Sequence, residues 1–105
     1  PWYGWFMAHD PLPVARRVRV PALVLHGATD TQVTPEQAEL LARALRTRAR
    51  PRAGRPDVTL RLFPATNHLF VPDPSGDSAR YAALTDPRIR PEVLGAVADW
   101  VVARR

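Results

Sequence analysis

Two short stretches of the chain have the side-chain pattern of β-strands. Residues 19–26 carry a continuous run of valine and leucine that ends at Gly27, which predicts a parallel strand buried on both faces in the interior of a sheet. Residues 57–63 alternate apolar and polar side chains until Pro64 stops the run. Because only one face of such a strand is fully covered, we expect it nearer the edge of the sheet.

Two helices are predicted by apolar residues at helical spacing. Thr34 is expected as the N-cap of the first helix, with Pro35 at the first helical position and Gln37 completing a capping box. The side of this helix that faces the sheet carries Ala38, Leu41, Ala42 and Leu45. The second helix is expected from about Pro91 to Ala103. One side of it carries Val93, Leu94, Val97, Trp100 and Val101.

The order strand, helix, strand, helix predicts an α/β fold in which two parallel strands are joined by a right-handed crossover and followed by C-terminal helices. Residues 1–16 are rich in aromatic side chains but broken by prolines, so we expect one short helix and then an extended lead into the first strand. Residues 47–56 are expected as a solvated loop. Residues 71–90 are expected as an irregular excursion long enough to form a lid or wall.

The length and composition narrow the class of protein. With 105 residues, of which 46% are hydrophobic and 24% charged, the chain makes one soluble globular domain at most. The absence of cysteine excludes disulfides, thiolate metal sites and a cysteine nucleophile. No apolar run approaches the roughly 18–20 residues that span a bilayer, and residues 1–4 do not resemble a signal peptide. The only methionine is Met7, so we expect the chain to be a piece of a longer protein.

The net charge of +5 comes from 15 arginines against 10 acidic residues, without any lysine. An arginine-only composition can reflect coding bias, so the charge says little about partners. Six arginines nevertheless fall within the 13 residues from Arg43 to Arg55, which leaves open a nucleic-acid-binding or anion-binding module. No aromatic side chain is interleaved with them for base stacking, so a solvated surface is the default interpretation and no nucleic-acid partner is expected.

Two parallel strands do not make a complete sheet. The predicted interior strand at 19–26 would lack a neighbour on one side, and its N–H and C=O groups would be exposed beside apolar side chains. We therefore expect further strands to be supplied from outside this chain.

Two ionisable residues directly follow the predicted strands. Asp30 lies in the turn after the first strand, where Gly27 allows a sharp bend, and His68 lies in the loop after the second. Functional groups of an open parallel sheet collect beyond the carboxyl ends of its strands, and adjacent strands lie only about 4.8 Å apart. A carboxylate on Nδ1 of an imidazole fixes the tautomer and leaves Nε2 to accept a proton. Asp30 and His68 are thus the candidate catalytic pair, two members of a nucleophilic triad.

The residues around this pair resemble those of the α/β-hydrolase fold. Residues 20–34 (V-P-A-L-V-L-H-G-A-T-D-T-Q-V-T) look like its acid-bearing strand and turn. Residues 63–70 (F-P-A-T-N-H-L-F) look like its histidine loop. Trp100 and the pair Asp10-Pro11 are similar to what the dienelactone-hydrolase-like and prolyl-oligopeptidase-like branches show.

This resemblance implies that residues 1–105 are a partial, C-terminal α/β-hydrolase domain with the acid strand, the histidine loop and the C-terminal helix. Asp30 would be the acid of a Ser-Asp-His triad and His68 its general base. The serine of such enzymes stands in a G-x-S-x-G elbow on an earlier strand, and this sequence has no such elbow. Its only serines, Ser75 and Ser78, follow His68 on a loop rich in proline and glycine, so neither is a credible nucleophile.

The sequence thus predicts the C-terminal segment of a serine hydrolase that cleaves carboxylic ester or peptide-type bonds. Its expected partners are a small-molecule ester or peptide substrate and the N-terminal remainder of the hydrolase domain, without a metal or organic cofactor, a nucleic acid or a membrane. Because the nucleophile is absent, this chain alone is expected to be inactive. The alternatives are a non-catalytic hydrolase-like fragment or interaction module and, less favoured, the arginine-rich nucleic-acid-binding module. Esterase or peptidase activity, the compartment and the oligomeric state stay open.

Other conspicuous residues have weaker claims to chemistry. His26 ends a buried strand, which favours a structural role over one lining the site, and His9 is expected at the surface. The three histidines lack the H-x-x-H or H-x-H spacing of a zinc site. Asn67 is expected to orient the histidine loop by hydrogen bonds to the backbone. Asp73 and Asp77 do not have the spacing of a calcium loop. Lining an acyl pocket and packing against the sheet are equally open for Trp2, Trp5 and Phe6.

Overall fold

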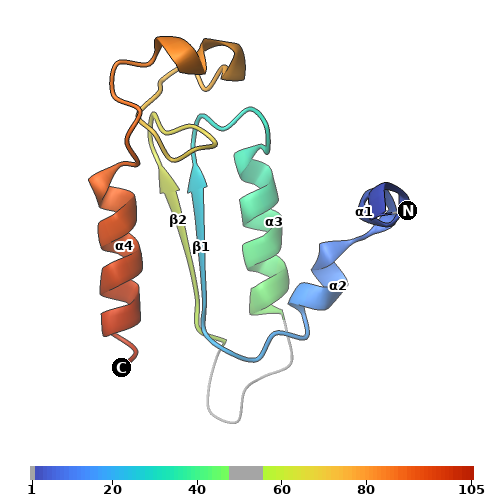
Figure 1. Ribbon diagram of the computed structural model, residues 1–105. Coiled ribbons are helices and arrows are strands. Elements are labelled where there is room, and N and C mark those ends of the chain that lie inside the picture. Colours follow the sequence, from blue (N-terminus) through green and yellow to red (C-terminus); the bar gives the residue numbers. More distant parts are fainter. Residues whose placement is uncertain (1, 48–55) are drawn as a thin grey trace.

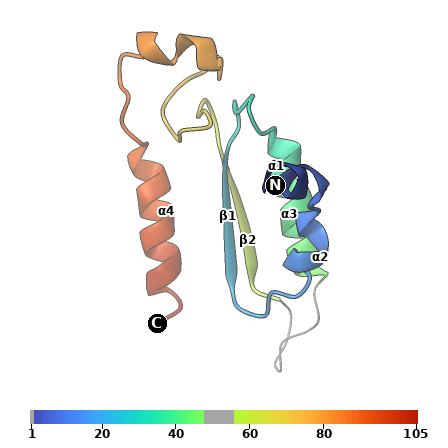
Figure 2. The ribbon, with the colours of Figure 1, turned by 45° about the vertical axis from the view of Figure 1, so that its right-hand side comes forward.

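The computed structural model has three layers (Figure 1), and it describes residues 2–47 and 56–105 without the side chains of Phe6 and Met7. The middle layer is a two-stranded sheet of β1 (Ala22–Gly27) and β2 (Val58–Phe63). Helix α3 (Pro35–Arg46) lies along one face of the sheet, and α4 (Pro91–Val102) lies along the other (Figures 1 and 2). The structure confirms the predicted α/β fold with two parallel strands, a helical crossover and a C-terminal helix.

The pairing of the strands brings their carboxyl ends to one edge of the sheet. Ala22 lies opposite Val58 and Gly27 opposite Phe63. The pairing begins at Ala22, later than the pattern at 19–26 predicts, because Pro21 has no N–H to donate. Among the described residues β2 is the only strand beside β1, so the interior position of β1 in a larger sheet stays a prediction.

The face of the sheet toward α3 holds the hydrophobic core. The residues buried together there are Ala15, Val24, Ala38, Ala44 and Leu45. Helix α3 begins after Thr34 with Pro35 at its first position, as predicted. The predicted capping box is wrong, because the Thr34 side chain makes no hydrogen bond to the helix backbone; its hydroxyl instead bonds the carboxylate of Glu36.

Helix α4 covers the other face less completely. Its C-terminal end is fixed to the start of β2 by Arg104, whose guanidinium bonds both carboxylate oxygens of Asp57 at 2.7 and 2.9 Å and lies 4.0 Å from the centre of the Trp100 ring. Of the predicted apolar side, only Val93 is buried. Leu94, Val97 and Val101 are exposed. Most of the apolar side predicted for this helix is therefore uncovered in the described chain.

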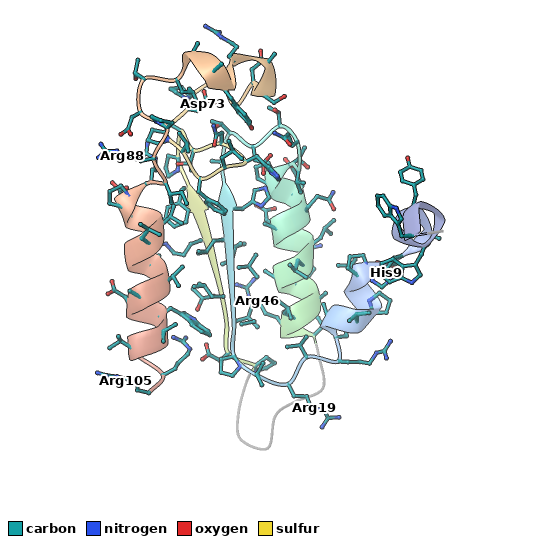
Figure 3. The ribbon with its side chains drawn as sticks, in the orientation of Figure 1. His9, Arg19, Arg46, Asp73, Arg88 and Arg105 are labelled. Carbon is teal, nitrogen blue, oxygen red and sulfur yellow. The ribbon has the colours of Figure 1, made fainter. Side chains whose placement is uncertain are left out.

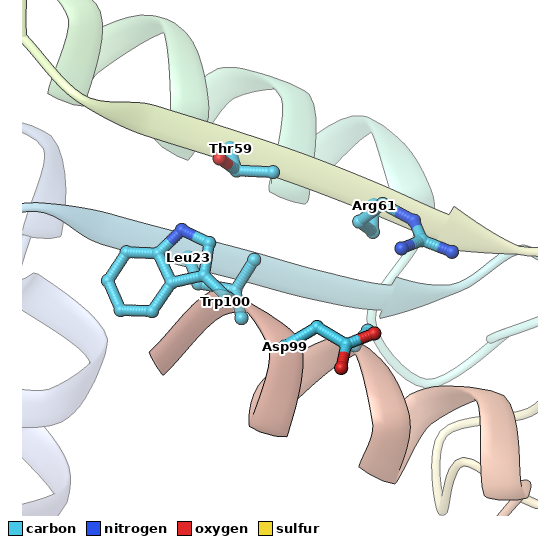
Figure 4. Close-up of a pocket in the computed structure, with 6 residues that line it drawn as sticks. Leu23, Thr59, Arg61, Asp99 and Trp100 are labelled. Carbon is cyan, nitrogen blue, oxygen red and sulfur yellow. The ribbon is translucent and has the colours of Figure 1, made fainter. Parts of the chain in front are cut away.

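A cavity of about 250 Å³ separates part of α4 from the sheet (Figure 4). It is lined by Leu23, Thr59, Arg61, Ala96, Asp99 and Trp100. The cavity lies along the strands, between them and the helix, and neither Asp30 nor His68 lines it. It is a packing defect between layers, separate from the edge of the sheet where the two candidate catalytic residues lie.

The N-terminal segment forms two short helices, α1 (Trp2–Ala8) and α2 (Pro11–Ala15), where one was predicted. The second arises because Oδ1 of Asp10 accepts a hydrogen bond from Leu12 N at 3.0 Å and caps it, with a proline in the first turn. Helix α2 packs against α3, and α1 stands apart from the sheet (Figures 1 and 2). Trp2 and Trp5 are accordingly 75% and 65% exposed and do not pack against the sheet. His9 is exposed, as predicted, and stacks on Trp5.

Some expectations fall on residues 48–55, outside the described residues. They include most of the predicted loop at 47–56 and four of the six clustered arginines. The two others, Arg43 and Arg46, are exposed on α3. No helix within residues 2–47 and 56–105 is both long enough and apolar enough to cross a bilayer.

Candidate active site

The loops after β1 and β2 meet beyond the carboxyl ends of the two parallel strands. Ala28 N donates to Phe63 O at 2.9 Å, and Thr29 N donates to Thr66 O at 3.0 Å. Gly27 lies at the crossing point, where a Cβ atom would overlap the Thr66 carbonyl. Only glycine allows the two loops to approach this closely.

Asp30 is held rigidly by its own turn. The residue is only 5% exposed, and its N–H donates to Gly27 O at 3.1 Å. Its Oδ1 accepts hydrogen bonds from the N–H groups of Gln32 and Val33, both at 2.9 Å. Its other oxygen, Oδ2, lies 2.9 Å from Nδ1 of His68. The structure therefore brings the two predicted residues into direct contact.

The environment of Asp30 favours its ionised form. Burial raises the pKa of Asp30 because a buried charge loses hydration. The hydrogen bond from the Val33 N–H, the hydrogen bond and charge of His68, and the hydrogen bond from the Gln32 N–H lower this pKa more. The pKa of Asp30 therefore lies below its ordinary value, and the carboxylate is ionised at neutral pH.

An ionised Asp30 fixes the proton of the His68 ring. A carboxylate oxygen only accepts hydrogen bonds, so Nδ1 of His68 must carry the hydrogen in their 2.9 Å contact. In the neutral ring Nε2 is then unprotonated and can accept a proton. The His68 side chain is 38% exposed, so a reacting group can approach it from solvent or from another segment.

The loop that carries His68 is organised by a fully buried Asn67. Oδ1 of Asn67 accepts hydrogen bonds from the N–H groups of Leu69 at 2.9 Å and Val71 at 3.1 Å. Two residues of this loop, Ala65 and Phe70, have positive φ angles of 47° and 61°. Non-glycine residues hold such angles only where the surroundings enforce them. The predicted role of Asn67 in orienting the histidine loop is confirmed.

The predicted excursion at 71–90 packs as a wall over residues 28–33, the turn after β1 that carries Asp30 and is called the acid turn below. The hydroxyl of Thr29 donates to Asp73 O at 2.6 Å, and that of Thr31 donates to Gly76 O at 2.7 Å. The 3₁₀ helix η1 (Ser78–Ala83) follows, and Tyr81 from it accepts a hydrogen bond from the Gln32 side chain at 2.9 Å. The wall therefore touches the same turn that positions Asp30.

Asp73 ties this wall to the histidine loop. It is buried at the carboxyl end of the strands (Figure 3), where its Oδ2 accepts a hydrogen bond from the Asn67 side chain at 3.2 Å and its Oδ1 one from the Ser75 hydroxyl at 2.8 Å. From the sequence, Asp73 is of interest only as a calcium ligand, and it lacks the spacing of a calcium loop. The D-P-S-G turn at 73–76 is the signal that marks it, because aspartate in such turns bonds its own backbone.

Comparison with known proteins identifies the family. Residues 3–86, which include the acid turn, β2 and the histidine loop, match the prolyl oligopeptidase family. The chain belongs to this family. Its resemblance to an α/β-hydrolase-type serine hydrolase is thereby confirmed.

One curated relative of this prolyl oligopeptidase family chain is the esterase EstD of Thermotoga maritima. The two are 28% identical over 93 residues, which cover 89% of this chain and 21% of EstD. The chain therefore spans about a fifth of the length of the curated relative it matches. No solved structure matches the chain.

Neither serine of this prolyl oligopeptidase family chain is bonded to His68. The hydroxyl of Ser75 donates to Asp73, and Ser78 opens η1. Within the described ranges, no group of three His, Cys, Asp or Glu side chains is placed to hold a metal ion.

His26, for which the sequence favours a structural role over one lining the site, lies near the end of β1 and reaches the turn that carries Asp30. Its Nε2 lies 2.8 Å from Val33 O and 3.2 Å from Oδ2 of Asp30, so it belongs to the site. In the sequence, the one indication that His26 contacts Asp30 is that it precedes Asp30 by four residues. Spacing of this kind brings side chains together in a helix, but in a strand followed by a turn it does so only through the geometry of that turn.

Proposed function

We propose that this chain supplies the acid and the general base of a Ser-Asp-His triad to a serine hydrolase that cleaves carboxylic ester or peptide-type bonds. The observation that carries the proposal is the 2.9 Å contact between Oδ2 of Asp30 and Nδ1 of His68 at the carboxyl edge of two parallel strands. Membership of the prolyl oligopeptidase family supports the reaction class.

In this proposal His68 moves one proton in each direction. Its Nε2 takes the proton of a serine hydroxyl while the serine oxygen attacks the carbonyl carbon. The imidazolium then gives the proton to the leaving alcohol or amine as the carbonyl–heteroatom bond breaks. Water repeats the sequence on the acyl-enzyme and releases the acid. Asp30 remains ionised throughout, holding the ring in place and stabilising its positive charge.

The nucleophile comes from a segment outside residues 1–105 in this proposal. The length ratio to EstD supports it, since the chain matches only 21% of that relative. The bonding of Ser75 supports it as well, because its hydroxyl faces Asp73 and not His68. Residues 1–105 are then part of a hydrolase domain, and their first partner is the N-terminal remainder of that domain.

The relative and the family suggest different bonds. EstD carries the name of an esterase and the family that of an oligopeptidase, and both reactions transfer an acyl group through the same triad. An activated ester such as p-nitrophenyl acetate is therefore a suitable first substrate, because it tests the triad without deciding between them.

The test compares variants of the complete polypeptide. Asp30→Asn should lower kcat for p-nitrophenyl acetate by roughly 10⁴, since an asparagine leaves His68 in the wrong tautomer. His68→Ala should lower it at least as much, and residues 1–105 alone should show no turnover. Asp77→Asn is the matched control, because Asp77 only caps η1. Turnover that survives His68→Ala, or a loss below tenfold in Asp30→Asn, would refute these assignments. A complete polypeptide without any hydrolase activity would favour the non-catalytic alternative.

A further inference from the structure

A second imidazole contacts the same carboxylate oxygen as His68. Nε2 of His26 lies 2.8 Å from Val33 O and 3.2 Å from Oδ2 of Asp30. A carbonyl and an ionised carboxylate are both acceptors only, so Nε2 of His26 must carry a hydrogen. The hydrogen bond from Nε2 goes to Val33 O, and Oδ2 of Asp30 lies beside it at 3.2 Å.

The hydrogen bond between His26 and Val33 joins the end of β1 to the end of the acid turn. The N–H of Val33 donates to Oδ1 of Asp30 at 2.9 Å, while its carbonyl accepts from His26. Val33 is therefore held on both sides, by the carboxylate and by the imidazole. The His26 side chain is only 13% exposed, so water has little access to replace it.

These contacts leave Oδ2 of Asp30 in one orientation. The N–H groups of Gln32 and Val33 fix Oδ1, and His26 occupies one side of Oδ2. The remaining side of Oδ2 faces Nδ1 of His68. Without the His26 donor, the turn loses one of the two hydrogen bonds that hold Val33, whose N–H in turn fixes Oδ1.

We propose that His26 is a positioning residue for the acid of the catalytic pair. Its Nε2–H holds the acid turn and Oδ2 of Asp30 in the orientation that His68 requires. The inference rests on the proposed function, because it assigns His26 a role in orienting that same pair. His26 acts through Asp30, and its 13% exposure leaves little of its surface for a substrate.

A matched pair of substitutions in the complete polypeptide tests the role. His26→Gln places its amide nitrogen near the position of Nε2 and keeps the donor, whereas His26→Asn places it near Nδ1, too short to reach Val33 O. Both variants are polar and of similar size. We expect His26→Asn to lower kcat for p-nitrophenyl acetate by roughly 10- to 100-fold with KM unchanged, as small misplacements of catalytic groups do. His26→Gln should recover most of the lost kcat.

A spectroscopic measurement separates positioning from stability. The Nδ1–H proton of His68, bonded to a carboxylate, should give a downfield proton NMR resonance that moves in His26→Asn and returns in His26→Gln. His9→Asn is the control, because His9 is exposed and its ring stacks on Trp5.

The outcomes distinguish this inference from the function on which it rests. Equal kcat values in the Gln and Asn variants, with an unmoved resonance, would overturn the positioning role of His26. If His68→Ala retains activity, the proposed function itself is wrong. If His68→Ala is inactive while His26→Asn behaves as wild type, only the inference about His26 is wrong.

Discussion

The buried carboxylate of Asp30 accepts hydrogen bonds from the protein in place of the water that it loses on burial. Oδ1 accepts hydrogen bonds from two backbone N–H groups of its own turn, and Oδ2 accepts one from the His68 ring. Burial alone would raise its pKa, but these hydrogen bonds stabilise the charged form more. The same bonds that keep the carboxylate ionised also fix its direction, so the electrostatics and the geometry of the site have one origin.

The lowered pKa of Asp30 makes stability depend on pH in a defined direction. Its pKa in the folded state lies below the value near 3.9 expected of an unfolded aspartate. The stabilisation is therefore fully present above about pH 4 and is lost as the pH falls through the folded-state pKa. In Asp30→Asn the fall in the urea unfolding midpoint between pH 6 and pH 2 should be shallower than in the wild type. Asp99→Asn, which changes an exposed residue on α4, should keep the wild-type slope. Equal slopes in Asp30→Asn and the wild type would show that the folded state does not favour the ionised Asp30.

The candidate site is formed by three loops that contact one another. The acid turn, the histidine loop and the wall at 71–90 are joined by hydrogen bonds between residues far apart in sequence, such as Thr29 with Asp73 and Thr31 with Gly76. Gly76 is the tightest point, with φ of +65° and no room for a Cβ beside the Thr29 carbonyl. Loss of this contact would move the wall away from the turn that holds Asp30.

Two glycine substitutions should have opposite effects on stability. Gly76→Ala places a Cβ against the Thr29 carbonyl in a left-handed conformation, which alone costs about 1–2 kcal/mol. Gly95→Ala adds a methyl group inside α4, where a Cβ meets no atom within 4 Å, and should stabilise by roughly 0.5–1 kcal/mol. Urea unfolding of the two variants checks the signs. A Gly76→Ala variant as stable as the wild type would mean that the wall does not press on the acid turn.

Side-chain periodicity was enough to predict the long elements but not the contacts between loops. The strands, α3 and α4 follow from apolar spacing and proline signals, and Asp30 and His68 follow from their places after the strands. Helix α2 was missed because it depends on one cap, Asp10, and not on a repeating pattern. The contacts of Asp73 with Asn67 and of His26 with Val33 could not be predicted, because they depend on how the turns fold back, which no short-range pattern encodes.

Packing is uneven across the part of the molecule that the structure describes. The α3 face holds the core, while exposed apolar side chains lie on α4 and α1. The most exposed of them on these helices are Trp2, Tyr3, Trp5, Leu94, Val101 and Val102. The radius of gyration is 15.8 Å, larger than the roughly 13 Å of a compact domain of about 100 residues. Among the described residues β2 is the one strand beside β1, and these features together support the proposal that more of a hydrolase domain covers the remaining surface.

This exposed surface should make residues 1–105 associate when they are produced alone. Open strand edges and apolar patches drive association at micromolar concentrations and above. Sedimentation velocity should show species larger than a monomer, and an apolar dye should bind. Leu94→Glu together with Val101→Glu should weaken association and dye binding, because both side chains are more than half exposed on α4. Val14→Glu, an exposed apolar position on α2, adds charge on the opposite side of the sheet and should change them less. A monomer that binds no dye would contradict the expected association of this surface.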